Sequence, residues 1–139
     1  MSNMDKLFLK ISAREESNGW DALSSAEHAI ATVMLLWYEV GNGGFHQYFF
    51  NSTGDLAHKA PDAFREIGAP QTADVVDRAN ALFGSEGPNK NRRKRQAQLK
   101  AFSESHLDKL DELDKFIFDD PEDLEQLLSE FALRNGLKE

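Results

Sequence analysis

Cysteine is absent from the 139 residues of this chain. The absence excludes disulfide bonds, thiolate nucleophiles and zinc sites with cysteine ligands, and it gives no reason to expect an oxidising compartment. Long apolar runs are also missing, because the longest, from Ala29 to Tyr38, is far shorter than the roughly 20 residues of a membrane-spanning helix. The amino-terminal segment lacks the apolar core and cleavage site of a signal peptide. We therefore expect a cytoplasmic protein that does not enter a membrane.

Runs of alternating β-branched residues, which are typical of strands, are absent too. Apolar residues instead recur at steps of three and four, the period of an amphipathic helix. With 40% hydrophobic and 10% aromatic residues, a chain of this length can bury a substantial core. The sequence predicts an all-α fold, a compact bundle of about six or seven helices that forms one domain over residues 1–139.

Turn residues and apolar spacing locate the predicted helices. One helix, apolar on most sides, is expected to start at Ser24 or Ser25, to carry Trp37 in the core and to end at Gly41. Shorter helices are predicted over residues 4–15, 45–50, 55–67 and 70–82.

Two further helices are predicted in the carboxyl-terminal part. A long acidic helix is expected over residues 91–118, with its core stripe formed by Leu99, Phe102, His106, Leu110, Leu113 and Ile117. The last helix is expected to begin with Asp120 as its N-cap and Pro121 at its first helical position, and to end at residues 135–136.

The formal charge of −8 is concentrated near the carboxyl terminus. From Ser103 to Glu139, twelve acids face four bases, which accounts for the whole excess. Five of the 16 lysines and arginines fall between Lys90 and Arg95. We interpret these cations as solvated or as paired with carboxylates of the last helices. Because the acidic neighbours would repel phosphates, we expect no direct binding to nucleic acid.

The acidic residues suggest a more specific function. Residues four apart on a helix are separated by about 6 Å along its axis, which is comparable with the spacing of phosphates along one DNA strand. A row of such carboxylates would imitate DNA toward a DNA-binding protein; the alternative is an ordinary solvated helix face. The candidate partner-binding carboxylates are Glu104, Asp108, Asp111, Glu112, Asp119, Asp120, Glu122, Asp123 and Glu125.

Metal binding and catalysis have little support. No two of the four histidines have the three- or four-residue spacing that would present both to one metal on a helix, and residues 119–123 lack the alternating ligands of a calcium loop. We expect no metal and no cofactor, and we assign no catalytic residue. One cluster, formed by Glu39, His46, Gln47 and Asn51, could bring an acid, an imidazole and two amides together. The alternative is a turn between packed helices.

Residues 39–52, with the sequence EVGNGGFHQYFFNS, resemble the signature of a bacterial family long classed as a domain of unknown function. Residues 20–23, 67–70, 79–83, 110–114 and 121–124 resemble the same family. One characterised relative is described as an acidic, all-helical, dimeric DNA mimic that binds a transcription factor. The signature residues in this chain are Glu39, Asn42, Gly43, Gly44, Phe45, His46, Gln47 and Asn51.

The resemblance implies a non-enzymatic interaction module, with a DNA-binding protein as partner and a homodimer as its assembly. It does not transfer mimicry by itself, because mimicry depends on surface carboxylates outside the signature. Two alternatives stay open: an enzyme or small-molecule-binding protein that uses the turn at residues 42–51, and an interaction domain without mimicry.

Overall fold

Seven α-helices and two 3-10 helices make up the fold in residues 2–138, which the computed structural model describes. No strand occurs in this part of the chain, so the predicted all-α class is confirmed. The helices, in chain order, are α1 (Asn3–Asn18), η1 (Trp20–Ala22), α2 (Ser25–Phe50), η2 (Ser52–Leu56), α3 (Ala60–Glu66), α4 (Pro70–Ala81), α5 (Arg92–Lys100), α6 (Glu104–Asp119) and α7 (Leu124–Arg134).

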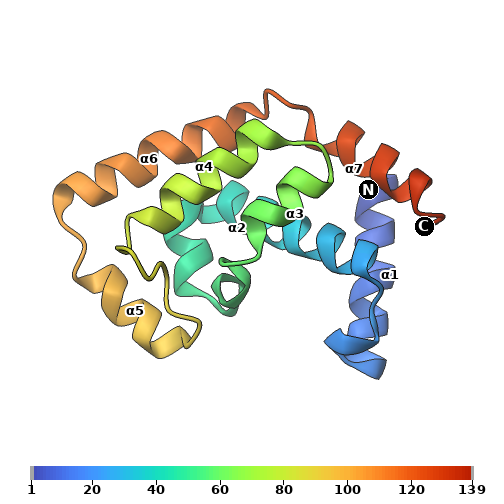
Figure 1. Ribbon diagram of the computed structural model, residues 1–139, viewed down its shortest axis with the longest axis horizontal. Coiled ribbons are helices and arrows are strands. Elements are labelled where there is room, and N and C mark those ends of the chain that lie inside the picture. Colours follow the sequence, from blue (N-terminus) through green and yellow to red (C-terminus); the bar gives the residue numbers. More distant parts are fainter. Residues whose placement is uncertain (1, 139) are drawn as a thin grey trace.

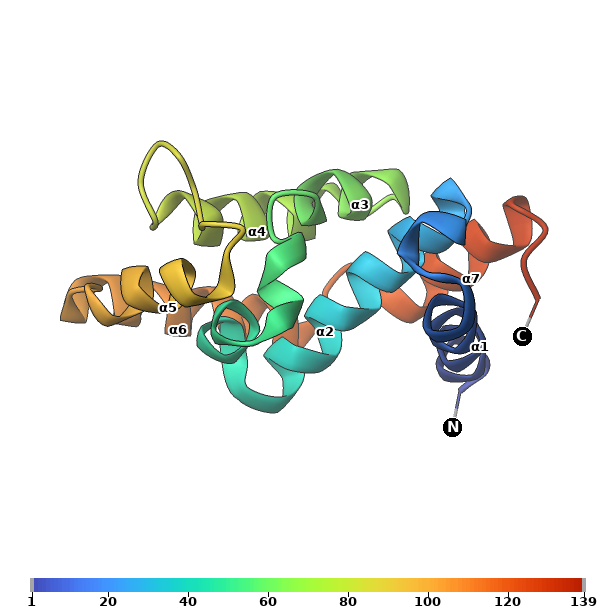
Figure 2. The same ribbon diagram turned by 90° about the horizontal axis from the view of Figure 1, so that it is seen from below.

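Helix α2 runs through the middle of an elongated molecule and contacts most other helices (Figures 1 and 2). Helix α6 packs against α2 and α4, while α1 and α7 lie together at one end and α5 lies at the other. The core is continuous and includes Ile30, Val33, Leu36, Phe45 and Phe49 of α2, which are fully buried. Among the described residues, no helix combines the length and hydrophobicity that a membrane crossing needs.

The predicted end of a helix at Gly41 is wrong, because α2 continues past Gly41 and is kinked at Gly43 and Gly44. Helix α2 bends at Gly43 (φ −154°, ψ 18°) and Gly44 (φ 77°, ψ 178°), and then resumes through the aromatic segment that was predicted as a separate helix. The φ of Gly44 lies in a region that side-chain-bearing residues rarely adopt. The two glycines therefore redirect the helix and let its second half enter the core.

The predicted single helix over residues 91–118 is wrong, because the chain forms α5 and α6 with a break at residues 101–103. A capping box starts α6: Ser103 Oγ accepts a hydrogen bond from His106 N, and Ser103 N donates one to His106 Nδ1 (3.2 Å each). His106 therefore belongs to a helix cap and packs at a tilt against Phe102, with 5.0 Å between ring centroids. Of the predicted stripe, Leu99, Leu110 and Ile117 are buried.

The predicted start of the last helix at Asp120 is also wrong. Asp120 adopts a left-handed conformation (φ 46°) and its amide donates to Phe116 O, so it closes α6 and cannot begin α7. The N-cap of α7 is Asp123, whose side chain accepts from Gln126 N, and Pro121 precedes the helix. We call residues 120–123 the capping loop.

The prediction that Trp37 lies in the core is confirmed only in part. Trp37 packs against the core cluster but is partly exposed. The fully buried positions around it are Met34, Leu36 and Val40. Truncating Trp37 is therefore expected to cost less than the roughly 3–5 kcal/mol of a fully buried aromatic residue.

Glu27, which is buried at the start of α2, gives a pH-dependent prediction. Burial opposes its ionisation, but hydrogen bonds from Ser24 and Arg14 outweigh burial and lower the pKa below the ordinary 4.5. Glu27→Ala should lower the free energy of unfolding by about 1–2 kcal/mol at pH 7. A lowered folded-state pKa stabilises the fold above the unfolded-state value, so the difference should shrink as pH falls below about 4.5.

Urea unfolding followed by circular dichroism at pH 7 and pH 3.5 measures this difference. Glu16→Ala serves as the control, because Glu16 is exposed on α1. A loss that is the same at both pH values would show that Glu27 contributes through packing and not through its charge.

Candidate partner-binding surface

Five of the predicted carboxylates lie on the solvent side of α6. Glu104, Asp108, Asp111, Glu112 and Asp119 are all exposed, whereas Leu110 and Ile117 on the other side are buried. At 1.5 Å per residue, the 16 residues of α6 span about 24 Å. We call these five residues the acidic face. The structure therefore brings them together on one helix.

The carboxylates of the capping loop have a different environment. Glu122 Oε1 accepts hydrogen bonds from Thr72 N and Thr72 Oγ1 (2.6 Å each), and Glu122 Oε2 accepts from Gln71 N (3.2 Å). No side chain of α4 caps its own amino terminus, so Glu122 provides this cap from 50 residues away. The amino terminus of a helix carries a partial positive charge, which also stabilises a carboxylate at this position.

Asp120 serves a second helix end. Its Oδ1 accepts from Leu124 N (3.0 Å). Burial raises the pKa of Asp120, the hydrogen bond from Leu124 opposes this shift, and the charges of Asp123, Glu122 and Glu125 add to it. Asp120 and Glu122 are thus partly buried and engaged in hydrogen bonds, whereas Asp123, which caps α7, and Glu125 are exposed at the start of α7.

Asp114 joins α6 to the kink of α2, which the sequence did not reveal. Asp114 Oδ1 accepts a hydrogen bond from Phe45 N (2.7 Å), at the first turn after Gly44. Burial raises the pKa of Asp114 and the Asp111 charge adds to the shift, while the Phe45 hydrogen bond and His46 oppose it. Asp114 therefore acts as an N-cap, supplied by α6, for the second half of α2.

The signature residues split into two groups, and they do not all converge as the catalytic hypothesis requires. Glu39 Oε2 accepts from Gln47 Nε2 (2.6 Å) and from Asn51 Nδ2 (3.3 Å), so these three side chains hold the kink together. His46 makes neither of these bonds. It is exposed and stacks on Phe50, with 6.4 Å between centroids. This geometry favours a structural role for the turn.

Close packing explains the paired glycines of the signature. A Cβ at Gly43 would lie 2.9 Å from Gln47 Cβ, and a Cβ at Gly44 would lie 2.5 Å from Asp114 Oδ2. Phe45 is fully buried, and Asn42 is exposed at the rim of a neighbouring pocket. Asn42, Gly43, Gly44 and Phe45 thus mark a bend in the backbone.

The basic cluster at residues 90–95 contains a buried arginine, contrary to the interpretation of the whole cluster as solvated or paired with the last helices. Arg95 has 0% of its surface exposed and pairs with Asp55 (2.9 Å). Its guanidinium also donates to the carbonyls of Phe49, Asn51, Asn89 and Lys90. The other four cations are exposed.

No group of three or more histidine and acidic side chains within residues 2–138 is arranged to hold a metal ion. Comparisons with curated proteins and with solved structures found no match. A family model described as DMP19-like protein matches residues 21–135, a range that includes the kink of α2, the acidic face and the capping loop. The chain therefore belongs to the DMP19-like protein family.

Proposed function

We propose that the protein is an interaction module that acts as a DNA mimic, with its acidic face occupying the DNA-binding surface of another protein. The observation that carries the proposal is the set of exposed carboxylates on one side of α6. Membership in the DMP19-like family, which includes DNA mimics, is compatible with this role.

The first part of α6 suits this role best. Glu104, Asp108 and Asp111 follow one another at steps of four and three residues, and Glu112 lies beside them. Lys115 is exposed on the same side of the helix by its spacing, so it interrupts the row before Asp119. A basic groove that normally binds phosphates would therefore engage mainly the four carboxylates before Lys115.

The inner contacts of α6 support the proposal because they order the surface. Its amino terminus is fixed by the Ser103 capping box, and Asp114 ties its middle to α2. A helix whose backbone is already ordered loses little backbone conformational freedom when a partner binds. The acidic face is thus a preorganised surface and not a flexible acidic tail.

Charge reversal tests the proposal. The triple variant Asp108→Lys, Asp111→Lys, Glu112→Lys should lose binding to DNA-binding proteins captured from a bacterial lysate, because the new cations would repel a basic groove. We expect at least a tenfold loss in affinity for the captured protein, with an unchanged helical circular-dichroism spectrum. Duplex DNA should compete with the unmodified protein, and high salt should weaken the complex.

A matched control carries Asp21→Lys, Glu66→Lys and Glu86→Lys, which are exposed positions outside α6 and α7. It changes the net charge equally and should retain binding. Retention by the α6 variant would contradict the proposal. An equal loss in both variants would show that net charge, and not the acidic face, governs the interaction.

A further inference from the structure

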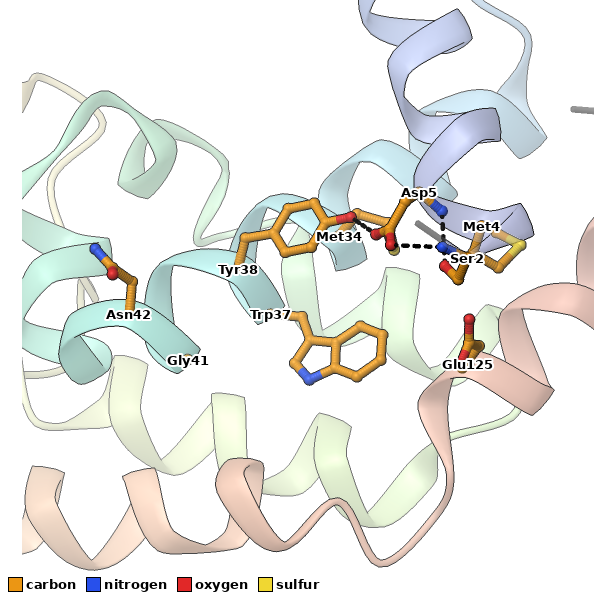
Figure 3. A pocket seen from close by; sticks show the side chains of 9 residues that line it. All are labelled: Ser2, Met4, Asp5, Met34, Trp37, Tyr38, Gly41, Asn42 and Glu125. Atoms are coloured by element: carbon orange, nitrogen blue, oxygen red, sulfur yellow. Dashed lines mark hydrogen bonds between the residues drawn. The ribbon is translucent and has the colours of Figure 1, made fainter.

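A pocket of about 450 Å³ opens between α1, α2 and the start of α7 (Figure 3). Its lining combines the aromatic and thioether groups of Trp37, Tyr38, Met4 and Met34 with the carboxylates Asp5 and Glu125, and the neutral polar side chains of Ser2 and Asn42 complete it. Both aromatic rings extend from α2 toward α1 and α7, where the two carboxylates lie. Among residues 2–138, no lysine or arginine lines this pocket. Its chemistry is therefore apolar and aromatic with negative charge at one end.

The aromatic side of the pocket is held in place. Tyr38 packs edge-on against Phe8, with 5.3 Å between centroids, and its hydroxyl donates a hydrogen bond to Asp5 Oδ1. Trp37 packs partly against the core and leaves part of its ring accessible. The face of an indole attracts cations more strongly than the faces of tyrosine or phenylalanine. The accessible part of Trp37 thus offers a surface for a flat cation.

The two carboxylates supply the charge. Hydrogen bonds from Tyr38 and from Ser2 lower the pKa of Asp5, so it is ionised at neutral pH. Glu125 is exposed at the first turn of α7. Burial raises the pKa of Tyr38, and the hydrogen bond to Asp5 and the charges of Asp5 and Glu125 raise it further. Asp5 and Glu125 both line the pocket.

We propose that this pocket binds a guanidinium group, which stacks on Trp37 and donates hydrogen bonds to Glu125. A planar guanidinium combines stacking on an aromatic face with a fork of donors that matches a carboxylate. A quaternary ammonium has no donors to match Glu125 and depends on a cage of aromatic rings. The volume lies within the range of small-ligand sites and accommodates an arginine side chain.

The guanidinium has two sources, a free guanidino compound and an arginine side chain of another protein. The second source rests on the proposed function, because Glu125 also belongs to the carboxylates predicted to face a DNA-binding protein. The chemistry at Trp37 is the same for both sources, so it is tested first with a capped amino acid.

The test is a ¹H–¹⁵N NMR titration with N-acetyl-arginine amide. N-acetyl-citrulline amide is the matched ligand, because it has nearly the same shape but no charge. The arginine compound should shift the Trp37 indole and Asn42 signals with a millimolar dissociation constant, while citrulline should not. Trp20, which lines a different pocket, gives an internal reference.

Variants identify the contacts. Glu125→Gln and Trp37→Leu should each weaken binding by about threefold to thirtyfold. Glu130→Gln, an exposed position on α7 that does not line the pocket, should leave it unchanged. Glu125→Gln keeps the test valid if Trp37→Leu destabilises the fold. Equal binding of citrulline, or undiminished binding by Glu125→Gln, would overturn the proposal.

Two further experiments distinguish the two sources of the guanidinium and test whether pocket binding is independent of mimicry. A Gly-Gly-Arg-Gly-Gly peptide that shifts the same signals shows that a protein-borne arginine enters the pocket; a peptide that fails while capped arginine binds identifies a free compound. The α6 charge-reversal variant should still bind capped arginine. Guanidinium binding in the pocket can therefore be confirmed even if the DNA-mimic proposal is contradicted. Mimicry can likewise be confirmed if the pocket does not bind a guanidinium.

Discussion

Replacing Arg95 by methionine should lower the free energy of unfolding by about 3–5 kcal/mol. The fully buried guanidinium binds Asp55 (2.9 Å) and the carbonyl oxygens of Asn51 and Asn89 (2.8 Å each). Methionine replaces the aliphatic part of the arginine side chain but has no donor, so these carbonyls would be left without partners inside the protein. Equilibrium urea unfolding, followed by circular dichroism, measures the loss.

The neighbouring Arg93 provides the control. Arg93→Met removes the same charge from the same helix, but Arg93 is exposed and its replacement should change stability by less than about 0.5 kcal/mol. A comparable effect of both substitutions would mean that net charge, and not the buried hydrogen bonds, stabilises this region. The difference between the two variants is thus the quantity to compare.

Gly44→Ala should lower the free energy of unfolding by about 2–4 kcal/mol. Gly44 combines a φ of 77° with a ψ of 178°, a conformation that is nearly restricted to glycine. The added methyl group would also meet Asp114 Oδ2 at 2.5 Å and disturb the hydrogen bond between Asp114 and Phe45 N. Both effects act on the contact that joins α2 to α6.

Gly41→Ala is the matched control for the kink. A Cβ at Gly41 meets no atom within 4 Å, and the residue lies in the first, regular half of α2. Because alanine favours a helix over glycine, this variant should be stabilised by up to about 1 kcal/mol. Thermal unfolding of the two variants should shift in opposite directions. A shift in the same direction would contradict the conformation of the kink described above.

The fold class was predictable because helical periodicity depends on local spacing. The break between α5 and α6 was missed because Leu99, Phe102 and His106 keep this spacing across it. The sequence does mark the start of α6, because Ser103 is followed three residues later by His106, which takes the place of the usual Glu or Gln in a capping box.

The surroundings of the candidate site were less predictable because they depend on contacts between distant residues. The exposed carboxylates of α6 follow from helix geometry, whereas Glu122 reaches Thr72 and Asp114 reaches Phe45 across the fold. Arg95 is the clearest case. In the sequence it stands among exposed cations, and only the packing of α5 against α2 and η2 shows that it is buried.

The anchoring of α6 at both its ends and its middle has a consequence for selectivity. Aspartate side chains are short, so each charge stays close to a position along the axis that the helix backbone fixes. A rigid groove with cations at matching intervals meets these charges without ordering either surface. A disordered basic tail must lose its own conformational freedom to adopt the same spacing, which reduces its affinity. Under the proposed function, the rigidity of α6 therefore favours folded basic partners over flexible polycations.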